Sequence, residues 1–228
     1  MPTTMEYFTS DGRRVTADLF LPKGTGRHPA VLILHGMAGL LPPYRADFES
    51  FAEALVEKQI AAVMPHYLEE MDSELGIQAG AAMLDRLPVI RARCSDALRF
   101  MRNQSSVNAG RLGVIGFSLG GHLALGLGMS PPTGISLKAV VDFFGPTTAP
   151  PLLGSRASLP PVLVQHGTDD AIVPISDSVS LVNELRGLGR TEGVGYEFVS
   201  YPGQGHGFTG ADLTASRTKT VAFLETIL

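Results

Sequence analysis

Short apolar runs alternate with longer segments of helical periodicity through almost the whole chain, and this alternation limits the fold most. A continuous apolar run is typical of a strand buried on both faces, and apolar residues at three- and four-residue spacing indicate an amphipathic helix. Strands that alternate with helices favour an α/β fold with a mostly parallel central sheet and helices on both faces. The buried strands that we expect are Ala30–Leu34, Ile60–Met64, Arg111–Gly116, Leu137–Phe144, Pro161–Gln165 and Tyr196–Tyr201.

Helices are expected in the segments between and after these strands. They are Tyr44–Lys58, Val89–Arg102, Leu119–Met129, Ile175–Leu188 and Ala211–Leu228. A hairpin with its turn at Asp11-Gly12 is expected before the first buried strand, because Asp-Gly between alternating residues is typical of a tight turn. The 228 residues, 44% of them hydrophobic, suit one domain, and no linker or repeat divides them. We therefore predict a single domain over residues 1–228.

Composition excludes several classes of function. The 18 Lys and Arg residues are scattered among 22 Asp and Glu, for a net charge of −4, which argues against a nucleic-acid partner. The apolar runs are too short to span a bilayer, and residues 1–9 lack the features of a secretory signal, so we expect a soluble, cytoplasmic protein without a membrane partner. A single cysteine, Cys94, and the lack of zinc-ligand spacing predict neither a metal nor a cofactor.

A Gly-x-Ser-x-Gly pentapeptide, Gly116–Gly120, contains the first candidate catalytic residue, Ser118. The apolar run Leu112–Ile115 precedes it and the helix-compatible stretch Gly121–Met129 follows it. A serine on such a strand-to-helix turn has a strained backbone, needs tiny residues two positions before and after it, and exposes its hydroxyl beside helical N–H groups. The context therefore predicts Ser118 as a nucleophile.

Two further strand ends supply a base and an acid. A serine hydroxyl needs a base to take its proton, and that base needs a third group to orient it. His206 lies in a glycine-rich loop after the last expected strand, and Asp169 and Asp170 follow the strand that ends at Gln165. The local pattern leaves open which aspartate orients the histidine. The chain order serine, aspartate, histidine is that of the α/β-hydrolase fold.

The remaining site residues are predicted from their positions at strand ends. Two backbone N–H groups should bind an oxyanion: that of Leu119, directly after the nucleophile, and that of Met37, in the loop after the first buried strand. His35 and His166 are expected to hold loops through local hydrogen bonds, whereas His66 could touch substrate. The apolar residues that we expect to line a substrate pocket are Tyr67, Phe117, Phe144 and Phe208.

Five segments together resemble the dienelactone hydrolase family of the α/β-hydrolase superfamily. They are Val31–Leu40, Ala61–Tyr67, Arg111–Gly121, Val162–Pro174 and Tyr201–Phe208. The resemblance covers nearly the whole chain and implies an α/β-hydrolase fold. Few residues remain outside the expected core elements, so we expect no large cap domain. The resemblance also implies that Asp170 is the acid, because members place it fifth in the His-Gly-x-x-Asp pattern that starts at His166. Dienelactone hydrolases proper differ in having a cysteine nucleophile, and a glutamate where Gly36 stands.

A serine without that glutamate predicts an esterase that cleaves small carboxylic esters or lactones through an acyl-enzyme on Ser118. A thioesterase or small peptidase would use the same triad, and a non-catalytic relative that binds a small ligand is an alternative of another class. A reductase is disfavoured, because the Gly-x-Gly-x-x-Gly match at Gly205–Gly210 leaves no room for the helix and strand that should follow. The partner is then a small-molecule substrate, and the protein a monomer or homodimer.

Overall fold

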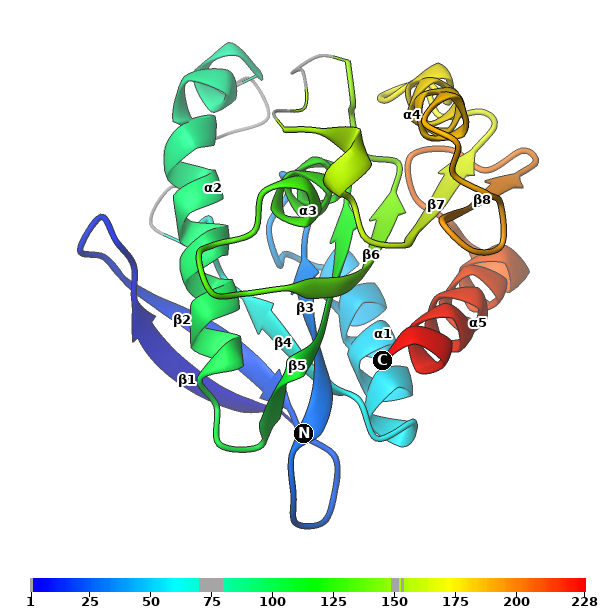
Figure 1. The fold of residues 1–228 in the computed structure, drawn as a ribbon. Coiled ribbons are helices and arrows are strands. Elements are labelled where there is room, and N and C mark those ends of the chain that lie inside the picture. Colours follow the sequence, from blue (N-terminus) through cyan, green and yellow to red (C-terminus); the bar gives the residue numbers. More distant parts are fainter. Residues whose placement is uncertain (1, 70–79, 149–151, 153) are drawn as a thin grey trace.

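The computed structural model describes residues 2–69, 80–148, 152 and 154–228, and they form an eight-stranded sheet in the order β1-β2-β4-β3-β5-β6-β7-β8 (Figure 1). The strands are β1 (Thr3–Phe8), β2 (Arg14–Phe20), β3 (His28–Leu34), β4 (Ala61–Pro65), β5 (Val107–Phe117), β6 (Leu137–Phe143), β7 (Val162–Gly167) and β8 (Tyr196–Tyr201). Strand β2 runs antiparallel to both its neighbours, and the six strands from β4 to β8 in the sheet order are parallel. The predicted mostly parallel sheet is confirmed.

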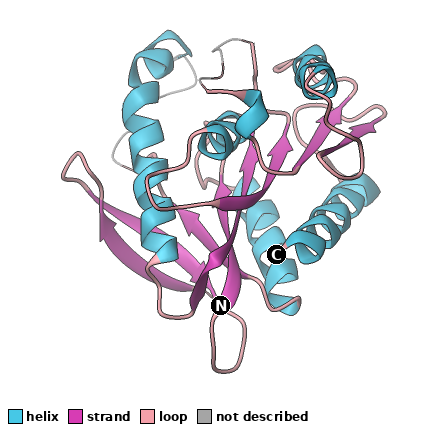
Figure 2. Cartoon of the chain, in the orientation of Figure 1, coloured by secondary structure: helices cyan, strands magenta, loops and turns pink. Residues whose placement is uncertain are grey.

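Helices cover both faces of this sheet (Figure 2). They are α1 (Tyr44–Glu57), α2 (Gly80–Arg102), α3 (Leu119–Met129), α4 (Ser176–Gly187) and α5 (Gly210–Ile227). One buried cluster joins apolar residues of α2, α3 and α4 to the sheet, and a second joins those of α1 and α5 to its other face. None of the described helices is long and apolar enough to cross a membrane.

Helix α2 begins at Gly80 rather than at the predicted Val89, and Pro88 lies inside it. A proline in a helix interior removes one backbone hydrogen bond, so in a sequence it normally indicates a helix end. Here the buried face continues across the proline, with Leu87 and Ile90 both packed in the core. Tertiary packing of that face compensates for the missing bond, which sequence periodicity alone did not indicate.

The parallel strands all end at one edge of the sheet, and the segments that follow them meet there. The loop after β3 holds residues 35–39, Ser118 follows β5, and Phe144 follows β6. Asp170 comes soon after β7 and His206 soon after β8. Ligands of open α/β sheets bind at this edge, so the fold gathers the predicted residues where a site is expected.

Candidate active site

Ser118 lies on a tight turn between β5 and α3 with φ 56° and ψ −118°. A Cβ atom on Gly116 would lie 1.9 Å from the carbonyl oxygen of Gly120, and one on Gly120 would lie 2.1 Å from that of Leu34. Only glycine fits at both positions, as the sequence pattern predicts. The N–H of Ser118 donates to the carbonyl of Phe143 at 2.9 Å, which ties the strained turn to the neighbouring strand.

The side chains of Ser118, His206 and Asp170 form a continuous hydrogen-bonded chain. Nε2 of His206 lies 2.8 Å from Oγ of Ser118, and Nδ1 lies 2.8 Å from Oδ2 of Asp170. A carboxylate only accepts hydrogen bonds, so Nδ1 carries the proton and Nε2 is left to accept the serine hydroxyl. The structure therefore brings together three residues that the sequence separates widely.

Asp170 is held rigidly in this chain. Its side chain is fully buried, and Oδ1 accepts the backbone N–H groups of Ile172 and Val173, each at 2.9 Å. His166 supports the same turn: Nε2 donates to the carbonyl of Val173 at 2.9 Å, and Nδ1 lies 2.7 Å from the hydroxyl of Ser178. Burial lowers the pKa of His166, which keeps its ring neutral in this role. The predicted local role of His166 is confirmed.

The loop after β3 adjoins Ser118. A Cβ on Gly36 would lie 3.4 Å from Cβ of Ser118, and the carbonyl of Gly36 accepts bonds from Nδ1 of His35 and from N–H of Gly39. Within the part of the chain that the structure describes, no group accepts the N–H of Met37 or of Leu119. The local bond of His35 is confirmed as predicted, and burial lowers its pKa to about 4.

Tyr67 does not line a pocket, which corrects the prediction made for it. The residue is fully buried, its ring stacks on His35 at a centroid distance of 4.2 Å, and its hydroxyl donates to the carbonyl of His35. A side chain with no exposed surface offers substrate nothing to bind. Tyr67 instead holds the loop that presents Met37. The apolar pattern around β4 could not distinguish these two uses of a tyrosine.

The three predicted pocket phenylalanines, Phe117, Phe144 and Phe208, belong to a buried aromatic cluster and each expose only 6–7% of their surface. They can present no more than an edge to substrate. The ring of Phe144 packs against His206 at a centroid distance of 4.7 Å, a contact that sequence reasoning missed. No sequence signal identifies it, because it depends on how the loop after β6 turns back.

Both ring nitrogens of His66 have partners within the protein. Nε2 lies 2.9 Å from Oδ2 of Asp18, and Nδ1 lies 2.9 Å from the hydroxyl of Thr16. The guanidinium of Arg45 donates to the same Asp18 oxygen at 2.6 Å. Because both ring nitrogens of His66 have partners, the contact with substrate that its position suggested has no support in the structure.

Asp142 is a further buried carboxyl group beside the site. The residue is fully buried at the end of β6, Oδ1 accepts the N–H of Gly145 at 3.1 Å, and Oδ2 has no hydrogen-bond partner among the residues that the structure describes. Burial raises the pKa of Asp142 to about 8, with the negative charge of Asp177 adding to the effect and the Gly145 bond opposing it. The group is therefore mostly protonated at neutral pH.

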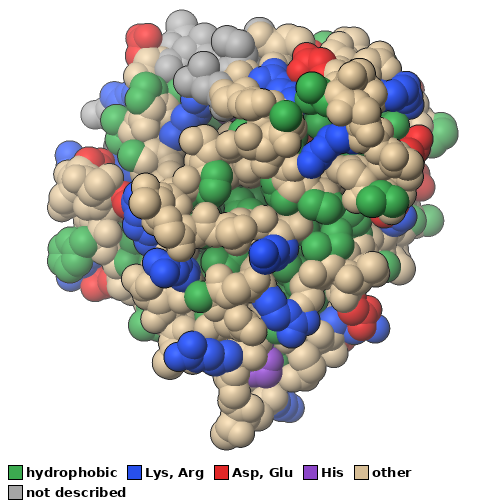
Figure 3. Space-filling view, in the orientation of Figure 1, with side chains coloured by type: hydrophobic (Ala, Val, Ile, Leu, Met, Phe, Trp, Pro, Cys, Tyr) green, Lys and Arg blue, Asp and Glu red, His purple; other side chains and the backbone are tan. Residues whose placement is uncertain are grey.

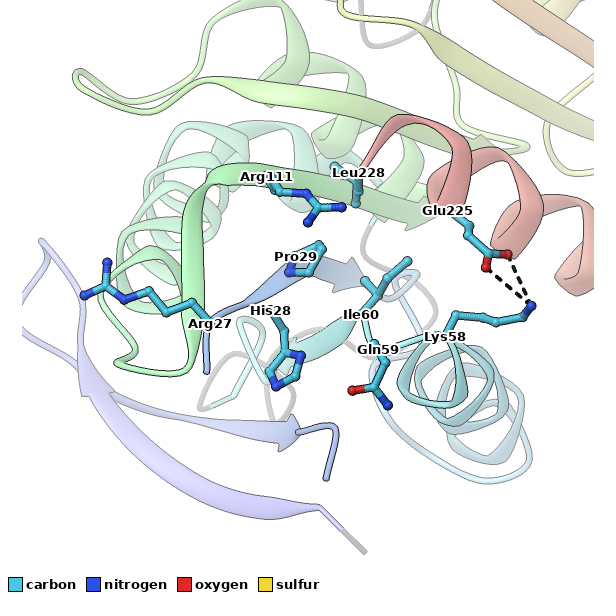
Figure 4. A pocket seen from close by; sticks show the side chains of 9 residues that line it. All are labelled: Arg27, His28, Pro29, Lys58, Gln59, Ile60, Arg111, Glu225 and Leu228. Atoms are coloured by element: carbon cyan, nitrogen blue, oxygen red, sulfur yellow. Dashed lines mark hydrogen bonds and ion pairs between the residues drawn. The ribbon is translucent and has the colours of Figure 1, made fainter. Parts of the chain in front are cut away.

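A cavity of about 250 Å³ lies at the opposite edge of the sheet (Figure 4). Its lining comes from the start of β3, from β5, from the segment before β4 and from the carboxyl end of α5: Arg27, His28, Pro29, Lys58, Gln59, Ile60, Arg111, Glu225 and Leu228. Figure 4 shows Lys58 directed at Glu225, and Arg27 directed away from the cavity. None of the three residues of the hydrogen-bonded chain lines it, so it is not the catalytic pocket.

The surface offers no single charged region on the face shown in Figure 3, where Lys and Arg side chains are dispersed among neutral and hydrophobic ones. Among residues 2–69, 80–148, 152 and 154–228, no three His, Cys, Asp or Glu side chains gather in a way that could hold a metal ion. Cys94 is buried in the core, as predicted.

The sheet, the serine on its turn and the chain order of the three residues define an α/β hydrolase. Comparison with known proteins narrows this class. The chain belongs to the dienelactone hydrolase family, whose model matches residues 15–222. The resemblance seen in the sequence is thereby confirmed, and the family is one of hydrolases.

Three individual relatives share only 20–27% of their aligned residues with this chain. A Bradyrhizobium protein named "Probable 2-oxo-3-(5-oxofuran-2-ylidene)propanoate lactonase" is 27% identical over 205 residues, which are 87% of this chain and 81% of that protein. The crystal structure of a dienelactone hydrolase from Anabaena variabilis has a TM-score of 0.74 at 20% identity, over 100% of this chain and 99% of its own. A dienelactone hydrolase-like promiscuous phosphotriesterase from metagenomic libraries has a TM-score of 0.77 at 21% identity, over 99% and 98% of the two chains. The two solved structures support the fold.

Proposed function

We propose that this protein is a serine hydrolase that cleaves small carboxylic esters or lactones through an acyl-enzyme on Ser118. The observation that carries the proposal is the hydrogen-bonded chain from Ser118 through His206 to Asp170, with 2.8 Å at each step. A hydroxyl, an imidazole and a carboxylate in this order are the parts that acyl transfer needs. The lactonase name of the Bradyrhizobium relative supports a lactone among the substrates.

In the first half-reaction, Nε2 of His206 takes the hydroxyl proton as Oγ of Ser118 bonds to the carbonyl carbon. The carbonyl electrons move to its oxygen, and the N–H groups of Met37 and Leu119 donate to the oxyanion that results. Collapse of this intermediate expels the alkoxide, which takes the proton from His206. For a lactone, the alkoxide stays attached to the acyl group.

In the second half-reaction, His206 removes a proton from water, and the hydroxide oxygen bonds to the acyl carbon. The ester bond to Ser118 then breaks, Oγ regains the proton from His206, and the acid leaves. Asp170 keeps Nδ1 protonated and stabilises the imidazolium that forms twice in each cycle. His206 acts as a base only while its imidazole is neutral.

The test is hydrolysis of p-nitrophenyl esters from acetate to octanoate and of a five-membered lactone, compared between the native protein and Ser118→Ala. We expect turnover of short esters that falls at least about 10³-fold in the variant. Full activity in Ser118→Ala would refute the nucleophile assignment.

A thioester and an aminoacyl amide belong in the same panel, because a thioesterase or small peptidase would use the same three residues. A fluorophosphonate that labels the native protein but not Ser118→Ala would exclude a non-catalytic binding role. The same panel therefore separates the proposed substrate class from the other classes that the fold allows.

A further inference from the structure

Two consecutive residues at the end of β6 contact both reacting groups of the site. The carbonyl of Phe143 accepts the N–H of Ser118 at 2.9 Å, and the ring of Phe144 lies 4.7 Å from that of His206. We propose that Phe144 is a positioning residue that holds the imidazole of His206 in line with Ser118. This inference rests on the proposed hydrolase function and adds a residue to its machinery.

The hydrogen bonds of His206 restrain its two ring nitrogens, with Nε2 at 2.8 Å from Oγ of Ser118 and Nδ1 at 2.8 Å from Oδ2 of Asp170. The Phe144 ring, inclined at 56° to the imidazole, packs against it at a centroid distance of 4.7 Å. The His206 side chain remains 16% exposed, so this packing leaves it accessible from the site. Because hydrogen bonds tolerate changes in distance and angle, the aromatic contact adds a steric limit on how far the imidazole can move.

The backbone of Phe144 is held in an unfavourable conformation. Its φ is +43°, in the left-handed region that bulky side chains rarely adopt. The N–H of Phe144 donates to the carbonyl of Gln165 at 3.0 Å, and the N–H of Gly145 donates to Asp142 at 3.1 Å. A Cβ on Gly145 would lie 2.4 Å from Oδ1 of Asp142, so the backbone at Gly145 lies too close to the Asp142 side chain for any other residue. Strain of this kind persists where the surroundings enforce it, often beside reacting groups.

The other neighbours of the ring leave it little freedom. Phe208 lies edge-on at 5.5 Å, Phe143 at 6.1 Å and His166 at 6.3 Å, and Phe144 is 7% exposed. The charged or titratable groups around His206 are Asp170, at Nδ1, and His166, behind that carboxylate. An aromatic ring also attracts the imidazolium that forms during turnover. Leucine fills space but has no π-system, so we expect that leucine at position 144 does not support activity as phenylalanine does.

The experiment compares three substitutions of Phe144. Phe144→Tyr keeps the ring, Phe144→Leu fills most of its volume without one, and Phe144→Gly removes the side chain and suits the positive φ. The matched control is Phe48→Leu, because Phe48 is equally buried at 7% and packs on Phe117 at 4.9 Å. Each protein is measured for kcat and KM with p-nitrophenyl acetate from pH 5 to 9, for the rate of fluorophosphonate labelling and for its thermal midpoint.

We expect Phe144→Leu and Phe144→Gly to lower kcat about tenfold or more, with KM changed less than about threefold, because the base is misplaced. The acid limb of the pH profile should move to lower pH in Phe144→Leu, since the imidazolium loses its aromatic neighbour. Phe144→Tyr should stay within about threefold of the native kcat, and Phe48→Leu within about twofold whatever its thermal midpoint.

Native kcat and pH profile in Phe144→Leu would overturn the proposal, as would an equal loss in Phe48→Leu. Should Phe144→Leu fail to fold, Phe144→Gly decides in the same way, because its backbone relaxes. A native protein that neither hydrolyses esters nor labels at Ser118 would instead refute the proposed function. If the native protein and Phe144→Leu are labelled at the same rate, the positioning role of Phe144 is refuted and the proposed hydrolase function is not.

Discussion

Two adjacent carboxylates, Asp169 and Asp170, have different surroundings. Asp170 is buried and faces Nδ1 of His206, whereas Asp169 is exposed and accepts the hydroxyl of its neighbour Thr168 at 2.7 Å. The N–H of Asp169 binds the carbonyl of Gln204, a backbone contact that any side chain at this position allows. Removing the charge of Asp169 is therefore a matched control for removing that of Asp170, because the two carboxylates are adjacent in the sequence and only Asp170 contacts His206.

We predict that Asp170→Asn lowers kcat for p-nitrophenyl acetate by about 10²- to 10⁴-fold, because an amide no longer keeps Nδ1 of the histidine protonated. Asp169→Asn should keep kcat within about twofold of native, since it removes the same charge from an exposed position. Steady-state kinetics of both variants check this. Equal losses in the two variants would mean that local charge, rather than the orientation of His206, is what matters.

Among the elements, the end of β7 and the loop after β8 approach closely at Gly167. A Cβ on Gly167 would lie 2.2 Å from the carbonyl oxygen of Gln204 and 2.7 Å from that of Gly205. Both contacts are to backbone, so an alanine here must push the loop away. His206 follows directly in that loop. The position of His206, the proposed base, therefore depends on a glycine at the end of β7.

Gly167→Ala should reduce kcat/KM about 10- to 100-fold, because small displacements of a reacting group are costly. Gly187→Ala is the control: Gly187 ends α4, nothing lies within 4 Å of a Cβ placed there, and alanine favours a helix. Its kcat/KM should remain native and its thermal midpoint unchanged or slightly raised. The prediction fails if both variants, or neither, lose activity.

The elements and the triad candidates could be read from the sequence because their signals are local. Apolar runs mark strands, and the serine turn, the aspartate pair and the histidine loop each follow one. The burial of Tyr67 and the left-handed φ of Phe144 depend instead on contacts between distant segments. The early start of α2 likewise reflects packing across Pro88. Sequence patterns carry no information about such contacts, which is why these features had to come from the structure.

At the scale of the whole molecule, Asp142 makes the free energy of unfolding depend on pH. Burial raises the pKa of Asp142 from its usual 3.8 to about 8, so between these values the native state keeps a proton that the unfolded state loses. The native state then binds more protons, and stability falls as the pH rises through this window. Below about pH 4 both states are protonated, and the penalty disappears.

Asp142→Asn replaces the protonated acid with a neutral group of similar shape and removes the titration. Relative to the native protein, the variant should gain roughly 2–4 kcal/mol in free energy of unfolding between pH 4 and pH 7. Urea unfolding at pH 4, 5.5, 7 and 8 measures this gain, and all other ionisable groups cancel in the difference between the two proteins. Parallel stability curves would show that Asp142 is ionised in the folded state, stabilised there by a group other than the N–H of Gly145. Equal m-values for the two proteins would indicate that the substitution changes the stability of the native state and not the compactness of the unfolded chain.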